Sequence, residues 1–86
     1  MVKTYSPSLT PASIANGAGT SDQAFTVTGL AVGDVVVVNP PGLTQYCAMT
    51  AARVSAVNTL ALTFVNVKGS GACTPLAGTY KVIAFR

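Results

Sequence analysis

The sequence predicts an all-β protein, a small antiparallel β-sandwich or barrel of about six short strands with an extended N-terminal arm. Runs of alternating apolar and polar residues are bounded by Gly, Pro and Asn, as is typical of half-buried strands. No window carries the apolar stripe of an amphipathic helix. The 86 residues are enough for one small domain. We expect an arm at residues 1–11 and a single β domain at residues 12–86.

The arm is expected from its prolines. Pro7 and Pro11 exclude a helix and favour extended backbone. The segment has no apolar run that could be buried, so we expect it to order only against a partner. A short strand at residues 12–15 would follow, ended by the turn signal Asn16-Gly17.

The next two strands differ in their pattern. Residues 24–28 alternate, with Phe25 and Val27 on one face and threonines on the other, which predicts a half-buried strand. Residues 35–38 are four consecutive valines, a pattern typical of a strand covered on both faces. In so small a domain we expect one cover to be the domain's own core and the other to be a neighbouring subunit.

A hairpin and a last strand complete the domain. Residues 47–55 and 60–65 are expected to pair around a turn at Val57-Asn58, since Asn tolerates left-handed backbone. In the first of these strands we expect one face to carry Met49, Ala51 and Arg53, and the other to carry Ala48, Ala52 and Val54. In the second, Leu60, Leu62 and Phe64 alternate with Ala61, Thr63 and Val65. In the last strand, residues 80–85, we expect Tyr80, Val82 and Ala84 on one face and Lys81, Ile83 and Phe85 on the other, so this strand is apolar on both faces apart from Lys81. The candidate subunit interface is therefore Val35, Val36, Val37, Val38, Ile83 and Phe85.

Composition favours a structural role. Charged residues make up 8% of the chain, against about 25% in an ordinary soluble domain. Such a surface suits contact with other proteins. The net charge of +3 comes from scattered single basic residues, which predicts no nucleic-acid partner. No signal peptide and no run of membrane-spanning length is visible, so we expect synthesis in a cytoplasm and no membrane partner.

The residues available for catalysis are few. The chain has no His, and Asp22 and Asp34 are its only side-chain carboxylates. A carboxylate pair could serve glycoside hydrolysis, but we expect both to accept hydrogen bonds in turns instead. We expect no enzymatic activity, no metal and no cofactor.

The cysteine and tyrosine pairs each allow two interpretations. Cys47 and Cys73 are either buried free thiols or a disulfide at one end of the sandwich. A bridge would close a loop of about 27 residues and contribute on the order of 3 kcal/mol. Tyr46 and Tyr80 either form a platform for a sugar or pack at the rim of the sandwich. For the tyrosines we favour packing at the rim. For the cysteines the sequence leaves open whether they are free thiols or a disulfide.

A family resemblance runs in order from Asp22 to Arg86. It is carried by residues 26–34 (TVTGLAVGD), the Val-rich strand ending at Asn39-Pro-Pro, residues 52–55 (ARVS), residues 58–66 (NTLALTFVN), and residues 74–86 with AGTY at 77–80. In these motifs the chain resembles head decoration (cement) proteins and fibre-type structural proteins of tailed bacteriophages. The cysteine pair and Tyr46 depart from that pattern.

The resemblance implies a virion structural protein without catalytic residues. We expect a homotrimer that stabilises the head by clamping the major capsid protein around a three-fold point. Its location would be the capsid surface, after synthesis in the host cytoplasm. The alternative is a tail or head fibre module that binds host-surface glycan, although the short chain favours decoration.

Overall fold

The computed structural model describes residues 2–15, 20–42, 46–68 and 70–86. For residues 20 and 21 it describes the backbone alone. The turn predicted at Asn16-Gly17 lies outside these residues. The described residues form strands and no helix, which confirms the all-β prediction. The strands are β1 Val2–Tyr5, β2 Ser8–Leu9, β3 Thr20–Thr26, β4 Val35–Asn39, β5 Cys47–Ala56, β6 Thr59–Asn66, β7 Gly78–Thr79 and β8 Lys81–Phe85.

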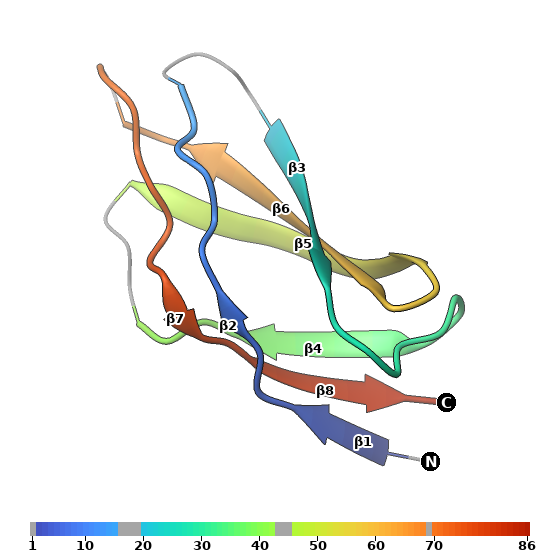
Figure 1. Cartoon of the computed structure of the whole chain (residues 1–86). Helices are drawn as coiled ribbons and strands as arrows, with labels where there is room; N and C mark the ends of the chain where they lie inside the picture. Colours follow the sequence, from blue (N-terminus) through green and yellow to red (C-terminus); the bar gives the residue numbers. More distant parts are fainter. Residues whose placement is uncertain (1, 16–19, 43–45, 69) are drawn as a thin grey trace.

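The strands form two antiparallel three-stranded sheets and a two-stranded ribbon. One sheet has the order β1-β8-β4, the other β3-β6-β5, and β2 pairs with β7. Figure 1 shows the two larger sheets as stacked layers, with β2 and β7 continuing β1 and β8 along one side. Among the described residues the sheets do not close into a barrel, so the sandwich is the better of the two predicted forms.

The core lies between the two sheets and follows the predicted alternation in β6 and β8. Leu60, Leu62 and Phe64 of β6 are buried, as are Val82 and Ala84 of β8. Each of these side chains points to one face because successive residues of a strand alternate. The inward faces of β6 and β8 were therefore predictable from the sequence.

The prediction for the faces of β5 is wrong in one respect. Met49 pairs with Phe64, and Ala52 pairs with Leu62, so these two β5 residues share the core face. The register shifts between Met49 and Ala51, at a β-bulge. One extra residue reverses the face of the side chains that follow it, up to the second register shift between Val54 and Ala56. Period-2 alternation read across residue 50 therefore places Ala51 on the wrong face.

The β5–β6 hairpin turns at Val57 and Asn58, as predicted. Asn58 has a φ of 58°, a conformation that Asn tolerates better than most residues. Its Oδ1 accepts a hydrogen bond from the Gly29 amide at 2.9 Å, and its amide donates to the Leu30 carbonyl at 2.9 Å. This hairpin is thus attached to the turn between β3 and β4. Gly29 has a φ of 108°, and a Cβ there would meet the Tyr5 hydroxyl oxygen at 2.9 Å.

The N-terminal segment is extended, as predicted, but the expectation that it orders only against a partner is wrong. β1 pairs along its whole length with β8, and β2 pairs with β7. The Pro7 carbonyl accepts a hydrogen bond from the Tyr80 amide at 2.9 Å, and Leu9 is buried. Main-chain pairing needs no particular side chains, so composition gave no sign that this segment belongs to the sheet.

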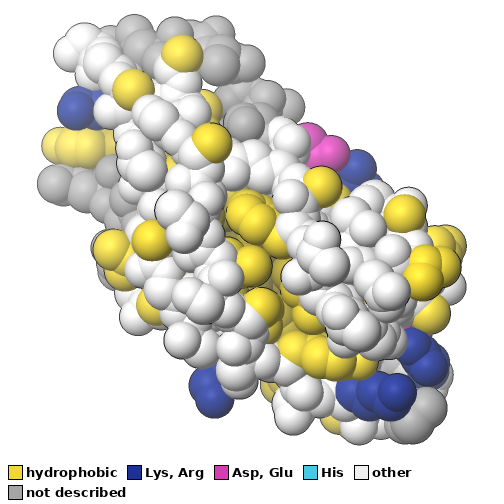
Figure 2. All heavy atoms as spheres, in the orientation of Figure 1, with side chains coloured by type: hydrophobic (Ala, Val, Ile, Leu, Met, Phe, Trp, Pro, Cys, Tyr) yellow, Lys and Arg dark blue, Asp and Glu magenta, His cyan; other side chains and the backbone are white. Residues whose placement is uncertain are grey.

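On one side of the sandwich, β3 lies beside the segment that follows β2. There the Gln23 carboxamide bonds both backbone groups of Ala12, accepting from its amide at 2.8 Å and donating to its carbonyl at 3.1 Å. Figure 2 looks onto this side and shows apolar side chains in a hollow between two ridges of polar surface. On the opposite side, β4 and β5 are in contact.

Candidate functional site

The Asp22 carboxylate lies in β3 rather than in a loop, which corrects the turn role expected for it. It accepts two hydrogen bonds from the Arg53 guanidinium, at 3.0 and 2.9 Å, and one from the Thr63 hydroxyl at 3.1 Å. The Arg53 hydrogen bond is the main cause that lowers the pKa of Asp22 below 3.8. Asp22 is therefore held as an anion on an exposed sheet face, which is the opposite of what a general acid needs.

The Asp34 carboxylate has the turn role that the sequence predicts. It accepts a hydrogen bond from the Ala31 amide at 3.1 Å and one from Arg86 Nε at 2.8 Å. Arg86 first, and then Ala31, lower the pKa of Asp34 below 3.8. Arg86 Nη2 also donates to the Gly29 carbonyl at 2.8 Å. The two carboxylates thus belong to separate ion pairs and do not face one another as a catalytic pair would.

The described ranges contain no group of three metal-ligating side chains. Ion-pairing and turn formation account for both carboxylates, so the features that remain are surfaces and the cysteine pair.

The outer face of the β1-β8-β4 sheet is apolar. Residues directly opposite one another in paired strands point to the same side. One row across the sheet is Val2, Phe85 and Val35, and the next row is Thr4, Ile83 and Val37. All six of these residues are exposed, with Val35 at 65% and Val37 at 55%. We call these six residues the outer apolar face.

Only four of the six residues predicted as a subunit interface lie on the outer apolar face. Val35, Val37, Ile83 and Phe85 lie on it. Val36 and Val38 are the exceptions, because they point inward and pack against the core. The strand is apolar on both sides, as predicted, and only alternate residues are available to a partner. Sequence reasoning missed Val2, which joins the face only because β1 is a strand of this sheet.

The outer face of the β3-β6-β5 sheet is different. Its rows contain Asp22, Thr63 and Ala51, and then Ala24, Ala61 and Arg53. Small and polar side chains and an ion pair cover it, as expected for a sheet face in water. The two outer faces of one domain therefore differ in chemistry.

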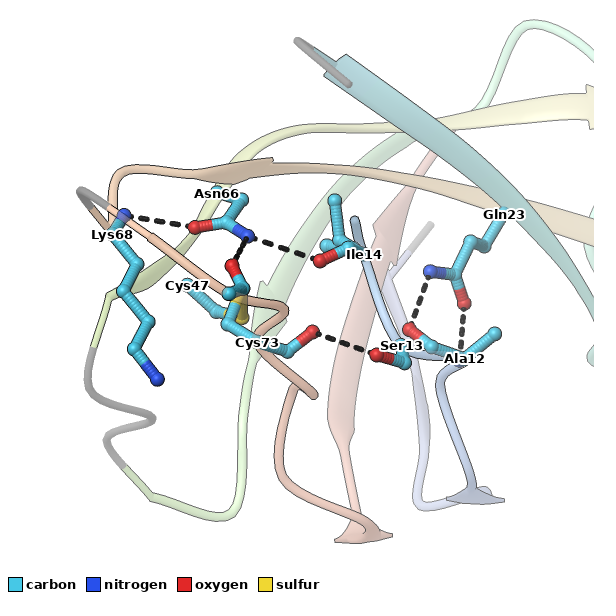
Figure 3. Close-up of a disulfide and its surroundings, with 9 residues drawn as sticks. Ala12, Ser13, Ile14, Gln23, Cys47, Asn66, Lys68 and Cys73 are labelled. Atoms are coloured by element: carbon cyan, nitrogen blue, oxygen red, sulfur yellow. Dashed lines mark hydrogen bonds between the residues drawn. A yellow bond between two sulfur atoms is a disulfide. The ribbon is translucent and has the colours of Figure 1, made fainter. Parts of the chain in front are cut away.

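Cys47 and Cys73 form a disulfide, so the structure has the second of the two states that the sequence left open. Cys47 begins β5, while Cys73 pairs with Ile14 in an isolated bridge. Figure 3 shows the bond beside the Asn66 carboxamide, which donates to the Ile14 carbonyl at 3.0 Å. The two cysteines lie at one end of the sandwich, as the disulfide interpretation required.

The two tyrosines do not form a platform. Tyr80 is 1% exposed, and its hydroxyl donates to the Leu76 carbonyl at 2.6 Å. Tyr46 is 46% exposed, but the Lys68 ammonium lies 5.9 Å from its ring centroid. A cation at that distance is attracted to the ring and covers one of its faces. Tyr46 is thus the one tyrosine of this pair that a ligand could reach.

In the part of the chain that the structure describes, there is no helix that could cross a membrane. The chain matches no family model, no curated protein and no solved structure.

Proposed function

We propose that this protein is a non-catalytic structural component of a bacteriophage virion, a decoration protein that binds the capsid surface as a homotrimer. The observation that supports this proposal most is the contrast between the two outer sheet faces. One is covered by small and polar residues, while the outer apolar face leaves five large hydrophobic side chains exposed.

The occupant of the outer apolar face is a second copy of the chain. The face carries no charge in its two rows, and Lys81 and Asn39 border it in the next row. It therefore offers hydrophobic contact and little charge by which to select a foreign partner. Around a three-fold axis the contacts are heterologous, so two different parts of this face would contact the two neighbouring subunits. Each subunit would then bury an area that a monomer leaves in water.

The remaining surface would contact the shell. The trimer would bridge several copies of the major capsid protein around a local three-fold point, and so resist their separation. The net charge of +3 suits an acidic lattice. In such a protein the function is the sum of subunit contacts and requires no catalytic group.

Retention on capsids tests the proposal. Purified capsids that lack the protein are mixed with the wild type, with Val37→Asp on the outer apolar face, and with Thr26→Asp on the polar sheet. Both positions are exposed β-branched strand residues, so the two variants are matched. We expect the wild type and Thr26→Asp to sediment with capsids and Val37→Asp to stay in solution. Equal retention of all three, or no retention of the wild type, would refute the proposal.

The second candidate is a fibre module that binds host glycan. Its support is the exposed Tyr46, and its weakness is that Tyr80 is buried and Lys68 covers one face of the Tyr46 ring. Binding of the wild type to a glycan panel, lost in Tyr46→Ala, would favour this candidate over decoration.

A further inference from the structure

Among the residues that the structure describes, few backbone hydrogen bonds join the disulfide end of the molecule to the rest. Residues 10–15 and 70–77, which we call the bridge strip, meet in one isolated bridge between Ile14 and Cys73. The two bonds of this bridge are Ile14 amide to Cys73 carbonyl, 2.7 Å, and Cys73 amide to Ile14 carbonyl, 3.0 Å. By contrast, β8 has a continuous ladder on both of its sides.

The side chain of Asn66 makes hydrogen bonds between the bridge strip and the β5–β6 hairpin. The strip is also held by packing, since Ile14 and Cys73 are buried in the core, and by the two hydrogen bonds between Ala12 and Gln23 of β3. Asn66 Nδ2 donates to the carbonyls of Ile14 and Gly71, at 3.0 and 3.1 Å, and Asn66 Oδ1 accepts from the Lys68 amide at 2.8 Å (Figure 3). Hydrogen bonds that are partly open to water contribute little net stability, since water replaces them when they break. The Cys47–Cys73 bond is the one covalent link between the bridge strip and β5.

We propose that this disulfide is a redox latch: it fixes the bridge strip to β5 when oxidised, and it lets the strip open locally when reduced, while the β1-β8-β4 sheet stays intact. The proposal deepens the proposed function, on which it rests for the change of environment. The chain would join an assembly in a reducing cytoplasm as a dithiol, and the latch would close after the particle reaches an oxidising medium.

The oxidant is a small-molecule disulfide, and the two cysteines have different roles. Cys73 is 6% exposed, and Cys47 is the more accessible of the two. The Cys47 thiolate attacks the small disulfide, forms a mixed disulfide and releases one small thiol. The Cys73 thiolate then attacks the Cys47 sulfur and releases the second small thiol. Two protein thiols are oxidised to one disulfide, and one small disulfide is reduced to two thiols.

Local opening has a specific consequence for assembly. The outer apolar face lies on β1, β4 and β8, away from the bridge strip. Reduction would therefore leave the subunit interface available and loosen only the disulfide end. The dithiol can associate first, and the latch closes afterwards without any rearrangement of the interface.

Amide hydrogen exchange of the full-length protein, oxidised and reduced, tests the latch. On reduction we expect exchange at Ile14 and Cys73 to accelerate at least about tenfold, as expected when a local opening becomes easier. We expect the paired amides of β8 to change by less than about twofold. The double variant Cys47→Ser, Cys73→Ser should show the exchange rates of the reduced protein, and adding reductant should not change them. Iodoacetamide should modify Cys47 before Cys73 in the reduced protein.

Three results would overturn the latch: no acceleration at Ile14 and Cys73, equal acceleration in β8, or global unfolding on reduction. The last two would make the bond a general staple of the fold. The mass of the oxidised protein separates this proposal from the previous one. If the protein is a monomer, and reduction accelerates exchange at Ile14 and Cys73 but not in β8, the trimer is refuted and the latch is supported. If the protein is a trimer and reduction does not produce this difference, the latch is refuted and the trimer is supported.

Discussion

Arg86 Nε donates a hydrogen bond to the Asp34 carboxylate at 2.8 Å across 52 positions of sequence. The Asp34 side chain is 3% exposed, whereas that of Asp22, in the other ion pair, is 49% exposed. Arg86 thus attaches the end of β8 to the turn before β4. The Asp34 pair should therefore matter more for stability than the Asp22 pair, because exposed ion pairs contribute little.

Asp34→Asn tests this difference. We expect it to lower the melting temperature clearly, since it removes the charge that binds Arg86. Asp22→Asn is the matched control, and its melting temperature should stay close to that of the wild type. Thermal unfolding followed by circular dichroism measures both. A larger loss in Asp22→Asn than in Asp34→Asn would contradict the assignment.

Stability should depend on pH through the same two carboxylates. The folded-state pKa of each is lowered below 3.8 by its arginine. The unfolded state therefore binds protons first, so the stability that these groups contribute is fully present above 3.8 and is lost as pH falls through the folded-state pKa values. Denaturant unfolding at a series of acidic pH values should show this decline. The double variant Asp22→Asn, Asp34→Asn should show a flatter profile, and an unchanged profile would contradict the assignment.

Two tyrosines should respond in opposite ways to the same substitution. The Tyr5 hydroxyl oxygen is buried and has no hydrogen-bond partner within the described residues, whereas that of Tyr80 donates to the Leu76 carbonyl. Tyr80→Phe should lower the free energy of unfolding by about 1 kcal/mol, and Tyr5→Phe should leave it unchanged or raise it by up to about 1 kcal/mol. Chemical denaturation gives both values. A greater loss in Tyr5→Phe would mean that its hydroxyl has a partner.

Deleting residues 2–9 should unfold the domain or strongly destabilise it. The deletion removes β1 and β2, exposes the edge of β8 and takes the buried Leu9 out of the core. The control is Ser8→Ala, which changes one exposed side chain of β2 and keeps the backbone pairing. Near-ultraviolet circular dichroism of the two proteins is the comparison. A truncated protein that melts like the wild type would show that the segment is an arm after all.

The sequence predicted what depends on local pattern. Alternation in β6 and β8, the Asn58 turn and the turn role of Asp34 each depend on a few neighbouring residues, and each is confirmed. The bulge in β5 was missed because nothing in a run of small residues marks the extra one. The pairing of β1 with β8 joins the two ends of the chain, and no local pattern encodes such a contact.

The candidate site was predictable in composition but not in detail. Four consecutive valines predicted a two-sided apolar strand, yet which of them point outward depends on the register with β8. The cysteine pair could not be assigned from spacing alone, because bond formation depends on the path of two separate segments.

The mass of the protein in solution tests the account most directly. At micromolar concentration, light scattering should give three times the 8.7 kDa of the chain for the wild type. Val37→Asp should give a folded monomer, because it places a charge on the outer apolar face. Val36→Asp should not fold, since its unpaired carboxylate would face the core at a cost of several kcal/mol. A monomeric wild type, or a Val37→Asp protein that remains trimeric, would contradict the assignment of this face as the subunit interface.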